Sequence, residues 1–286
     1  MNHRFTTLLK TATRTLRKYV MQPVKLTDEA TRKEISQRYL GKGNFPYLNY
    51  ATVEDFCDSA DHLPQICYLD GDLKNVQRPW ALKAILAKVP PGGKLLEIGG
   101  GVPLVACLLN ELGYEVTIVD PYEGAGNGPT EYQNYRRQFP NVNLVKDLFG
   151  VNLQGFEPGY FDCIYSISVL EHIPLEGIKD VFAGVRKFLR SGGYSIHCLD
   201  NVIQGEGGQF HEEVVKLVLQ EQKQLINPHA SLEDDYEKLL FQLKEDIETY
   251  YLSALGHHQW RCGAAYKDFP FRKVVSIQTC VAFSGD

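Results

Sequence analysis

The sequence lacks several features that mark whole classes of protein. Its 286 residues contain no apolar run of membrane-spanning length and no Cys-x-x-Cys pair among seven cysteines, so membrane insertion and a disulfide or zinc framework are not expected. The net charge of −5 argues against a broad nucleic-acid-binding face. A reducing compartment is favoured, and we expect the cytoplasm.

Acidic residues are absent from the first 27 positions. Basic residues recur between positions 4 and 25, and several apolar residues follow a rough helical spacing. Three interpretations stay open: a helix packed on the domain, an arm that contacts a membrane surface or an anionic partner, and an organellar transit peptide. Residues 27–75 read as short helices and loops.

The most informative stretch begins at residue 94. Residues 94–98 form a short apolar run typical of a buried strand, Gly99, Gly100 and Gly101 follow, and residues 102–112 have helical character. Glycine lets a backbone approach a ligand closely, and a helix start offers unpaired N–H groups. Strand, glycine turn and helix together predict a nucleotide-type binding corner.

Two acids decide which ligand suits this corner. Glu97 lies two residues before the first glycine, and Asp120 ends the next apolar strand, at residues 114–119. An acid in the second position typically holds ribose hydroxyls. The corner has no nearby Lys or Arg, so it disfavours phosphate and tolerates a positively charged ribose ligand. S-adenosylmethionine, a sulfonium nucleoside, fits this description.

A second stretch agrees with the first. Residues 161–174 read Phe-Asp-Cys-Ile-Tyr-Ser-Ile-Ser-Val-Leu-Glu-His-Ile-Pro, with a strand over 162–166. Together with Glu97-x-Gly99-x-Gly101 and Asp120, this segment resembles the class I S-adenosylmethionine-dependent methyltransferases. Pro103 replaces the third glycine of their usual pattern, which alters the turn but is acceptable at a helix start. The resemblance covers residues 80–200.

This resemblance implies a fold and a domain plan. We expect an α/β, doubly wound, mostly parallel seven-stranded sheet, with an N-terminal helical extension over 1–75 and the methyltransferase domain over 76–286. A strand is expected over 194–199, and two long helices over about 205–256 would form a lid inserted before the last strands. The second of these helices begins at a capping box at Ser231 and has an apolar packing stripe that includes Leu243 and Ile247. A strand near 260–266, paired with 274–282, would close the sheet as a hairpin. An enclosed pocket of this kind favours a small molecule over a protein or nucleic acid.

The resemblance also implies site residues. S-adenosyl-L-methionine would be the cofactor, and O-methylation of a sugar, lipid-like compound or secondary metabolite is the favoured reaction. The cofactor residues would be Glu97, Gly99, Gly100, Gly101, Asp120, Pro121, Tyr122, Asp147, Leu148, Ser166 and Ser168.

Methyl transfer needs alignment and, for many acceptors, a base. His172 is the best candidate base in the core, and His211 and His257 are further candidates near the proposed lid. Related ubiquinone-pathway and small-RNA methyltransferases bind a metal through a second Glu three residues before the Glu of the Glu-His pair. Ser168 stands at that position here, so no metal is predicted.

Two other functions compete with methyl transfer. A Rossmann-type NAD(P)-dependent oxidoreductase would require a small residue where Leu104 stands. A non-catalytic partner subunit with this fold would have no need of Glu97, the glycine turn and Asp120 together. Neither the acceptor nor the oligomeric state follows from the sequence.

Overall fold

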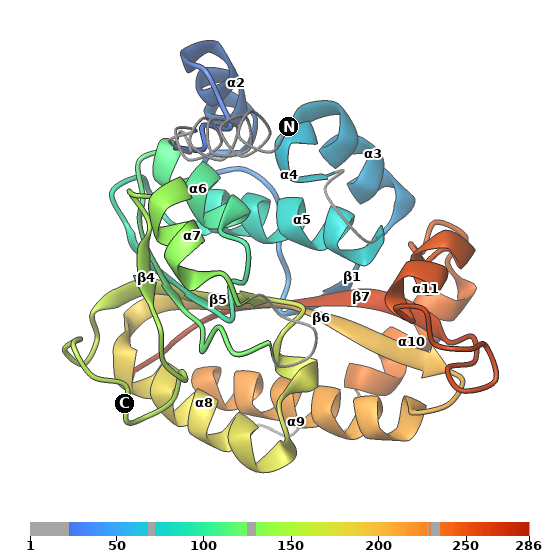
Figure 1. Ribbon diagram of the computed structural model, residues 1–286. Helices are drawn as coiled ribbons and strands as arrows, with labels where there is room; N and C mark the ends of the chain where they lie inside the picture. The colour runs from blue at the N-terminus through green and yellow to red at the C-terminus, as the bar shows by residue number, and fades with distance from the viewer. Residues whose placement is uncertain (1–22, 68–71, 125–129, 228, 230–234, 286) are drawn as a thin grey trace, which may run out of the picture.

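The computed structural model describes residues 23–67, 72–124, 130–227, 229 and 235–285. Within them the chain forms a seven-stranded sheet with helices on both faces (Figure 1). The strand order is β1-β7-β6-β5-β2-β3-β4. The strands are β1 (Leu48–Tyr50), β2 (Lys94–Ile98), β3 (Glu115–Val119), β4 (Asn143–Val145), β5 (Phe161–Ile167), β6 (Leu189–Gln204) and β7 (Lys273–Ala282).

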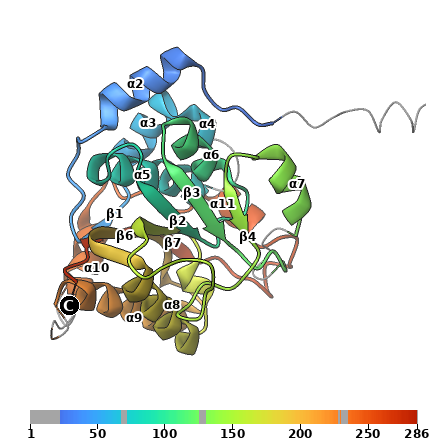
Figure 2. The same ribbon diagram turned by 90° about the vertical axis from the view of Figure 1, so that its left-hand side faces the viewer.

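Helices α2 to α6 cover one face of the sheet and α8 to α10 cover the other (Figures 1 and 2). Helix α11 lies at the end of the sheet toward which β6 runs. The helices are α2 (Glu29–Tyr39), α3 (Val53–His62), α4 (Pro64–Cys67), α5 (Asp72–Lys88), α6 (Leu104–Glu111), α7 (Tyr132–Gln138), α8 (Leu175–Phe188), α9 (Gly208–Ile226), α10 (Asp235–Glu245) and α11 (Ala254–Trp260).

The central strands are buried because both faces of the sheet are covered. Leu95, Leu96 and Ile164 have no measurable exposure, as expected where crossover helices put apolar side chains on each side. Strands β2 to β6 run parallel, and β7 is antiparallel to β6. The predicted α/β, mostly parallel, seven-stranded fold is confirmed.

The seventh strand is not the predicted one. Residues 254–260 are helical and the following residues form turns, so the hairpin expected from a strand near 260–266 is wrong. Leu48–Tyr50 pairs with β7 instead, in antiparallel register with Leu48 opposite Thr279. The segment between α2 and α3 therefore provides the seventh strand of the sheet.

Two further boundaries differ from those predicted. Strand β6 extends from Leu189 to Gln204 rather than over 194–199, because residues 199–204 keep pairing with β7. Helix α10 ends at Glu245, so Ile247, placed by its spacing in the helix's packing stripe, is 95% exposed. The predicted capping box at Ser231 lies outside the described residues.

Helices α9 and α10 form a layer on the sheet. Val214, Val218 and Leu243 are fully buried in the same apolar cluster as β5 and β6 residues. The lid over 205–256 and the domain boundary near 75 stay predictions. Most of the basic segment over 4–25 lies outside the described residues, and none of the described helices has the length and apolarity to cross a bilayer.

Two successive positions of the predicted packing stripe, Leu243 and Ile247, provide a matched test. Leu243→Ala removes a fully buried side chain and should lower the free energy of unfolding by about 2–5 kcal/mol. Ile247→Ala should change it by less than about 0.5 kcal/mol, because that side chain lies in solvent. Urea denaturation measures both variants. A large loss in the Ile247 variant would contradict the end of α10 at Glu245.

Candidate functional site

The glycine turn after β2 has no room for side chains. Gly99 has a φ of +64° and donates its N–H to the carbonyl of Val119 at 2.8 Å. A Cβ added to Gly100 would lie 2.8 Å from the Ile118 side chain and 2.9 Å from the Glu97 carboxyl carbon. The turn is therefore packed closely against the ends of β2 and β3.

Glu97 lies at the floor of this corner. Its side chain is 4% exposed, and its Oε2 accepts a hydrogen bond of 3.0 Å from the hydroxyl of Tyr165 on β5. Burial raises the pKa of Glu97 to about 8, and the nearby charge of Asp120 adds to this rise. The Tyr165 hydrogen bond and the Arg78 charge oppose it. The Glu97 carboxyl is thus mostly protonated and uncharged near pH 7. A cationic ligand bound beside it would favour the ionised form.

Asp120 connects the turn to the loop after β3. Its carboxylate accepts from the backbone N–H of Gly101 at 3.1 Å and of Tyr122 at 2.7 Å. Tyr122 adopts a φ of +50°, and its ring lies 5.3 Å from that of Tyr132. The buried Tyr122 hydroxyl has no hydrogen-bond partner among the described residues, and it lies within electrostatic reach of Asp120 and Glu97.

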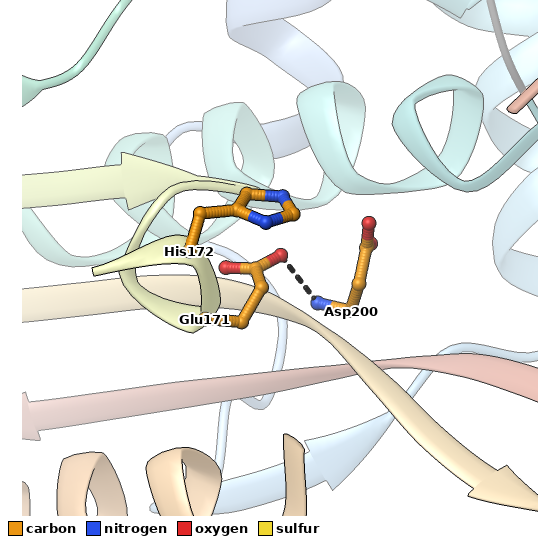
Figure 3. Close-up of side chains that lie close together, drawn as sticks. All are labelled: Glu171, His172 and Asp200. Carbon is orange, nitrogen blue, oxygen red and sulfur yellow. Dashed lines mark hydrogen bonds between the residues drawn. The ribbon is translucent and has the colours of Figure 1, made fainter. Parts of the chain in front are cut away.

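The second predicted segment runs beside the same turn. Ser166 on β5 is the register partner of Ile98, and a Cβ on Gly99 would meet the side chain of Val169 at 2.7 Å. A 3₁₀ turn at Leu170–His172 then places Glu171 and His172 next to Asp200 of β6. One ligand atom from each of the three residues lies within 4.8 Å of the others (Figure 3).

These three side chains differ in exposure. Glu171 and Asp200 are 1% and 4% exposed, whereas the His172 ring is accessible to solvent. Burial and the charge of Asp200 raise the pKa of Glu171 to about 8, and burial lowers the pKa of His172. The cluster therefore combines two buried acids with one neutral, accessible imidazole.

His211, near the start of α9, lies beside the cluster. It interacts electrostatically with His172 and Asp200, and burial lowers its pKa. Its Nδ1 is buried and has no hydrogen-bond partner in the part of the chain that the structure describes. Two of the three predicted candidate bases, His172 and His211, are thus brought together.

A protein-family model described as a methyltransferase domain matches residues 74–228, more than half of the chain. This match includes the glycine turn, both acids and the Glu171–His172–Asp200 cluster. The chain belongs to this methyltransferase family. The predicted family is therefore confirmed.

Two curated proteins are related to this methyltransferase in sequence. Both are uncharacterized proteins of Mycobacterium tuberculosis, from strains CDC 1551 and H37Rv, and each is 33% identical over 104 residues. These residues are 34% of this chain and 33% of each relative. The match spans about a third of the length of the curated relatives.

Solved structures with a similar fold include phosphoethanolamine N-methyltransferase 2 of Haemonchus contortus in complex with S-adenosyl-L-methionine. It is 15% identical, with a TM-score of 0.43 and coverage of 93% of this chain and 76% of that one. Geranyl diphosphate C-methyltransferase of Streptomyces coelicolor is 13% identical, with a TM-score of 0.43 and coverage of 90% and 100%.

The other predicted cofactor-binding residues differ in their exposure. Ser166 is fully buried and its hydroxyl bonds to His197 at 2.8 Å, so its side chain is sealed within the sheet. Asp147 and Leu148 are exposed, and the Asp147 carboxylate accepts from the N–H of Leu148. Pro121 is half-buried between Asp120 and Tyr122.

His257, the third candidate base, lies on α11. It is packed on α11 among Tyr266, Phe269 and Phe271, with ring centroids 5.1–6.5 Å away. Its electrostatic neighbours include Arg261, Arg272 and His258, and Arg272 is also a neighbour of His211. Its assignment as a candidate base stays a prediction that this packing disfavours.

Sequence reasoning missed Asp200 and its support. Asp200 directly follows the apolar run at 194–199, and acids at such strand ends commonly face ligands. The position was therefore detectable by the argument that identified Asp120. Gln77, which donates to Asp200 at 2.7 Å from α5, carried no sequence signal because its helix reads as ordinary core.

The pKa of Glu97 gives a test of the corner that needs no ligand. Folding raises this pKa from 4.5 to about 8, so the stabilisation from the protonated carboxyl is complete below pH 4.5 and is lost as the pH rises toward 8. Glu97→Gln keeps an uncharged acceptor for Tyr165. Between pH 4.5 and 8, the wild type should lose stability relative to this variant by about 3–5 kcal/mol.

Urea denaturation of the wild type and of Glu97→Gln across this pH range measures the difference between their free energies of unfolding. The contributions of the other titrating groups cancel in this difference because both proteins contain them. Glu115→Gln, at an exposed position on β3, is the matched control and should follow the wild type. Parallel stability curves for wild type and Glu97→Gln would contradict the buried, neutral carboxyl.

Proposed function

We propose that this protein transfers a methyl group from S-adenosyl-L-methionine to a hydroxyl of a small-molecule acceptor. The observation that carries the proposal is the placement of Glu97 and Asp120 around a side-chain-free turn, next to a polar cluster that contains two histidines. The family match supports methyl transfer. The donor, the acceptor class and the residue roles below are parts of the proposal.

The corner fits the cofactor chemically. Asp120 has lone pairs beyond its two backbone hydrogen bonds and would accept from the ribose hydroxyls. The unpartnered hydroxyl of Tyr122 lies near the same acid and would bond the bound nucleoside. Gly99 and Gly100 would let the backbone contact the methionine part. Asp147 and Leu148 would border the adenine from their exposed loop.

The charge of the corner suits a sulfonium. Glu97 is buried and raised in pKa, so it would ionise when a positive ligand arrives. Asp120 adds a second acid within interaction range. A phosphate-bearing dinucleotide would meet repulsion from both acids. The two acids therefore favour S-adenosylmethionine over NAD(P), the cofactor of the rival oxidoreductase.

When bound, the cofactor supplies an activated methyl group and a neutral leaving group. The acceptor oxygen forms the new bond to the methyl carbon as the carbon–sulfur bond breaks. The protein must align these atoms and remove the hydroxyl proton. We assign the proton to Nδ1 of His211, a buried nitrogen without a partner among the described residues. His172 would line the acceptor side, where its ring is accessible.

A substitution at Asp120 tests its assignment as the residue that binds the ribose hydroxyls. Asp120→Ala should weaken S-adenosylmethionine binding by about 1–3 kcal/mol, because hydrogen bonds to a carboxylate are lost. S-adenosylhomocysteine should lose the same amount, since it carries the same ribose. Isothermal titration calorimetry measures both. Asp120→Asn, which keeps an acceptor for Tyr122, checks that the loss does not come from a disordered loop, and Asp268→Ala, at an exposed site, is the control.

A substitution at His211 tests its assignment as the base. His211→Gln should lower kcat by about 10²–10⁴-fold with an unchanged KM for S-adenosylmethionine. Formation of S-adenosylhomocysteine is measured with a panel of catechols, sugars and hydroxy acids. The loss should shrink for a nitrocatechol, whose hydroxyl is already ionised. His258→Gln, on the exposed face of α11, should retain wild-type kcat. An equal loss for all acceptors would exclude His211 as the base.

A further inference from the structure

A guanidinium group lies where β6, α9 and β7 meet. Arg272 directly precedes β7, and its Cα would lie 3.1 Å from a Cβ on Gly205, in the turn that follows β6. Its Nε is buried and has no hydrogen-bond partner among the described residues, and no acid among them lies within ion-pair distance. A buried cationic donor without a partner costs free energy. Arg272 therefore indicates a ligand of negative charge.

Two contacts fix the position of this guanidinium. Its Cζ lies 4.3 Å from the centroid of the Phe269 ring, close enough for a cation–π interaction. Its Cζ, Nη1 and Nη2 would each lie 3.6–3.7 Å from a Cβ on Gly207, which is van der Waals distance. Gly207 has a φ of +78° and directly precedes α9. The guanidinium is therefore held beside the start of that helix.

The start of α9 carries positive charge of its own. The first N–H groups of a helix lack partners within it and have a partial positive charge. Gly207 provides no side-chain cap for them, and the first turn contains no acid. Glu206, the preceding residue, is exposed and forms no ion pair with Arg272. A guanidinium and a helix start of the same sign, side by side, together attract an anion that both contact.

Two buried imidazoles lie near the guanidinium. His211, near the start of α9, is 8% exposed, and His257 on α11 is 4% exposed. Nδ1 of His211 and both ring nitrogens of His257 make no hydrogen bond of normal geometry within the described residues. Burial lowers the pKa of both rings, and the charge of Arg272 lowers it further. Both rings are thus uncharged near pH 7 and can offer a ligand an N–H donor or a free nitrogen.

Two other cations of this region have contacts of their own. Nζ of Lys273 lies 4.2 Å from the centroid of the Tyr251 ring. Nη2 of Arg261 lies 3.2 Å from Nδ1 of His258. Of these three cations, Arg272 is the one held beside the start of α9.

A single guanidinium at a helix start matches a carboxylate. Its planar fork binds a carboxylate through two parallel hydrogen bonds. A phosphate monoester carries about −1.5 to −2 charges at pH 7, so one guanidinium leaves part of this charge unbalanced. Asp200, whose charge also reaches His211, would repel such a dianion more strongly than a carboxylate.

We propose that Arg272 and the start of α9 bind a carboxylate group of the acceptor. On the basis of the proposed function, the methylated hydroxyl lies at His211 and the carboxylate at Arg272, which is within electrostatic range of that ring. Phe210 and Phe271, the chain neighbours of these two residues, are 50% and 45% exposed and would contact the rest of the acceptor. The acceptor is thus a hydroxy acid with an apolar body, such as an aromatic ring.

Fluorine NMR with matched ligands tests the carboxylate site without any assay of activity. The full chain, with and without saturating S-adenosylhomocysteine, is titrated with 4-fluorophenylacetate, its uncharged amide and 4-fluorophenyl phosphate. We expect the carboxylate to bind at least tenfold more tightly than the other two. Arg272→Gln should weaken binding of the carboxylate at least tenfold and leave that of the amide unchanged. Arg272→Lys, which keeps the charge without the planar fork, should recover only part of this loss.

Lys267→Gln, at an exposed position before β7, also removes one positive charge and should bind all three ligands like the wild type. Calorimetry with S-adenosylhomocysteine reports whether the fold and the cofactor corner of each variant are intact. Equal affinities of the wild type for the carboxylate and the amide would overturn the proposal. Equal losses in Arg272→Gln and Lys267→Gln, or tighter binding of the phosphate, would overturn it as well.

Inhibition of methyl transfer connects the site to the acceptor. 4-Fluorophenylacetate should compete with any acceptor of the panel that is methylated, and non-competitive inhibition would overturn the assignment of the carboxylate to the acceptor. A wild type that binds 4-fluorophenylacetate through Arg272 but does not bind S-adenosylhomocysteine would instead refute the proposed function and leave the carboxylate site standing.

Discussion

The structure depends on holding four carboxylates out of water at one edge of a parallel sheet. Glu97, Asp120, Glu171 and Asp200 are each less than a tenth exposed. The hydrogen bonds that these four carboxylates accept in the described part of the chain come from neutral donors: a tyrosine hydroxyl, backbone N–H groups, a serine hydroxyl and a glutamine amide. Neutral donors orient a carboxylate but do not cancel its charge. The edge is therefore organised to receive positive charge.

Much of this edge could be predicted because local sequence encodes it. A five-residue strand followed by three glycines admits few structures, and Asp120 is fixed by its position at the end of the next strand. The same strand-end argument applied to residues 194–199 would have identified Asp200. What local sequence cannot give is which strand ends meet: the proximity of Asp200 and Glu171 follows from the pairing of β5 with β6.

The errors in the fold have the same origin. Residues 48–50 form a strand only because β7 offers an unpaired edge, and three residues carry too little pattern to show this in advance. Helical spacing likewise placed Ile247 in the core, but the chain leaves the helix at Glu245 and pairs Thr249 with Thr52. In both places a long-range contact overrides a local preference.

The two acid pairs differ in a way that separates their ligands. Glu97 and Asp120 flank a turn of glycine residues without side chains. Such a turn suits an extended organic cation that lies against the backbone. Glu171 and Asp200 instead lie next to the His172 imidazole, with one atom of each side chain within 4.8 Å of the others. A Cβ added to Gly99 would meet the side chain of Val169, two residues before Glu171, so the glycine turn lies next to the segment that carries the second pair. Positive charge at one pair would lower the negative potential at the other, because all four acids share one low-dielectric edge. A positively charged ligand at one pair should therefore weaken the binding of a second positive ligand at the other, and this opposition would end when the sulfonium of the proposed cofactor becomes the neutral product.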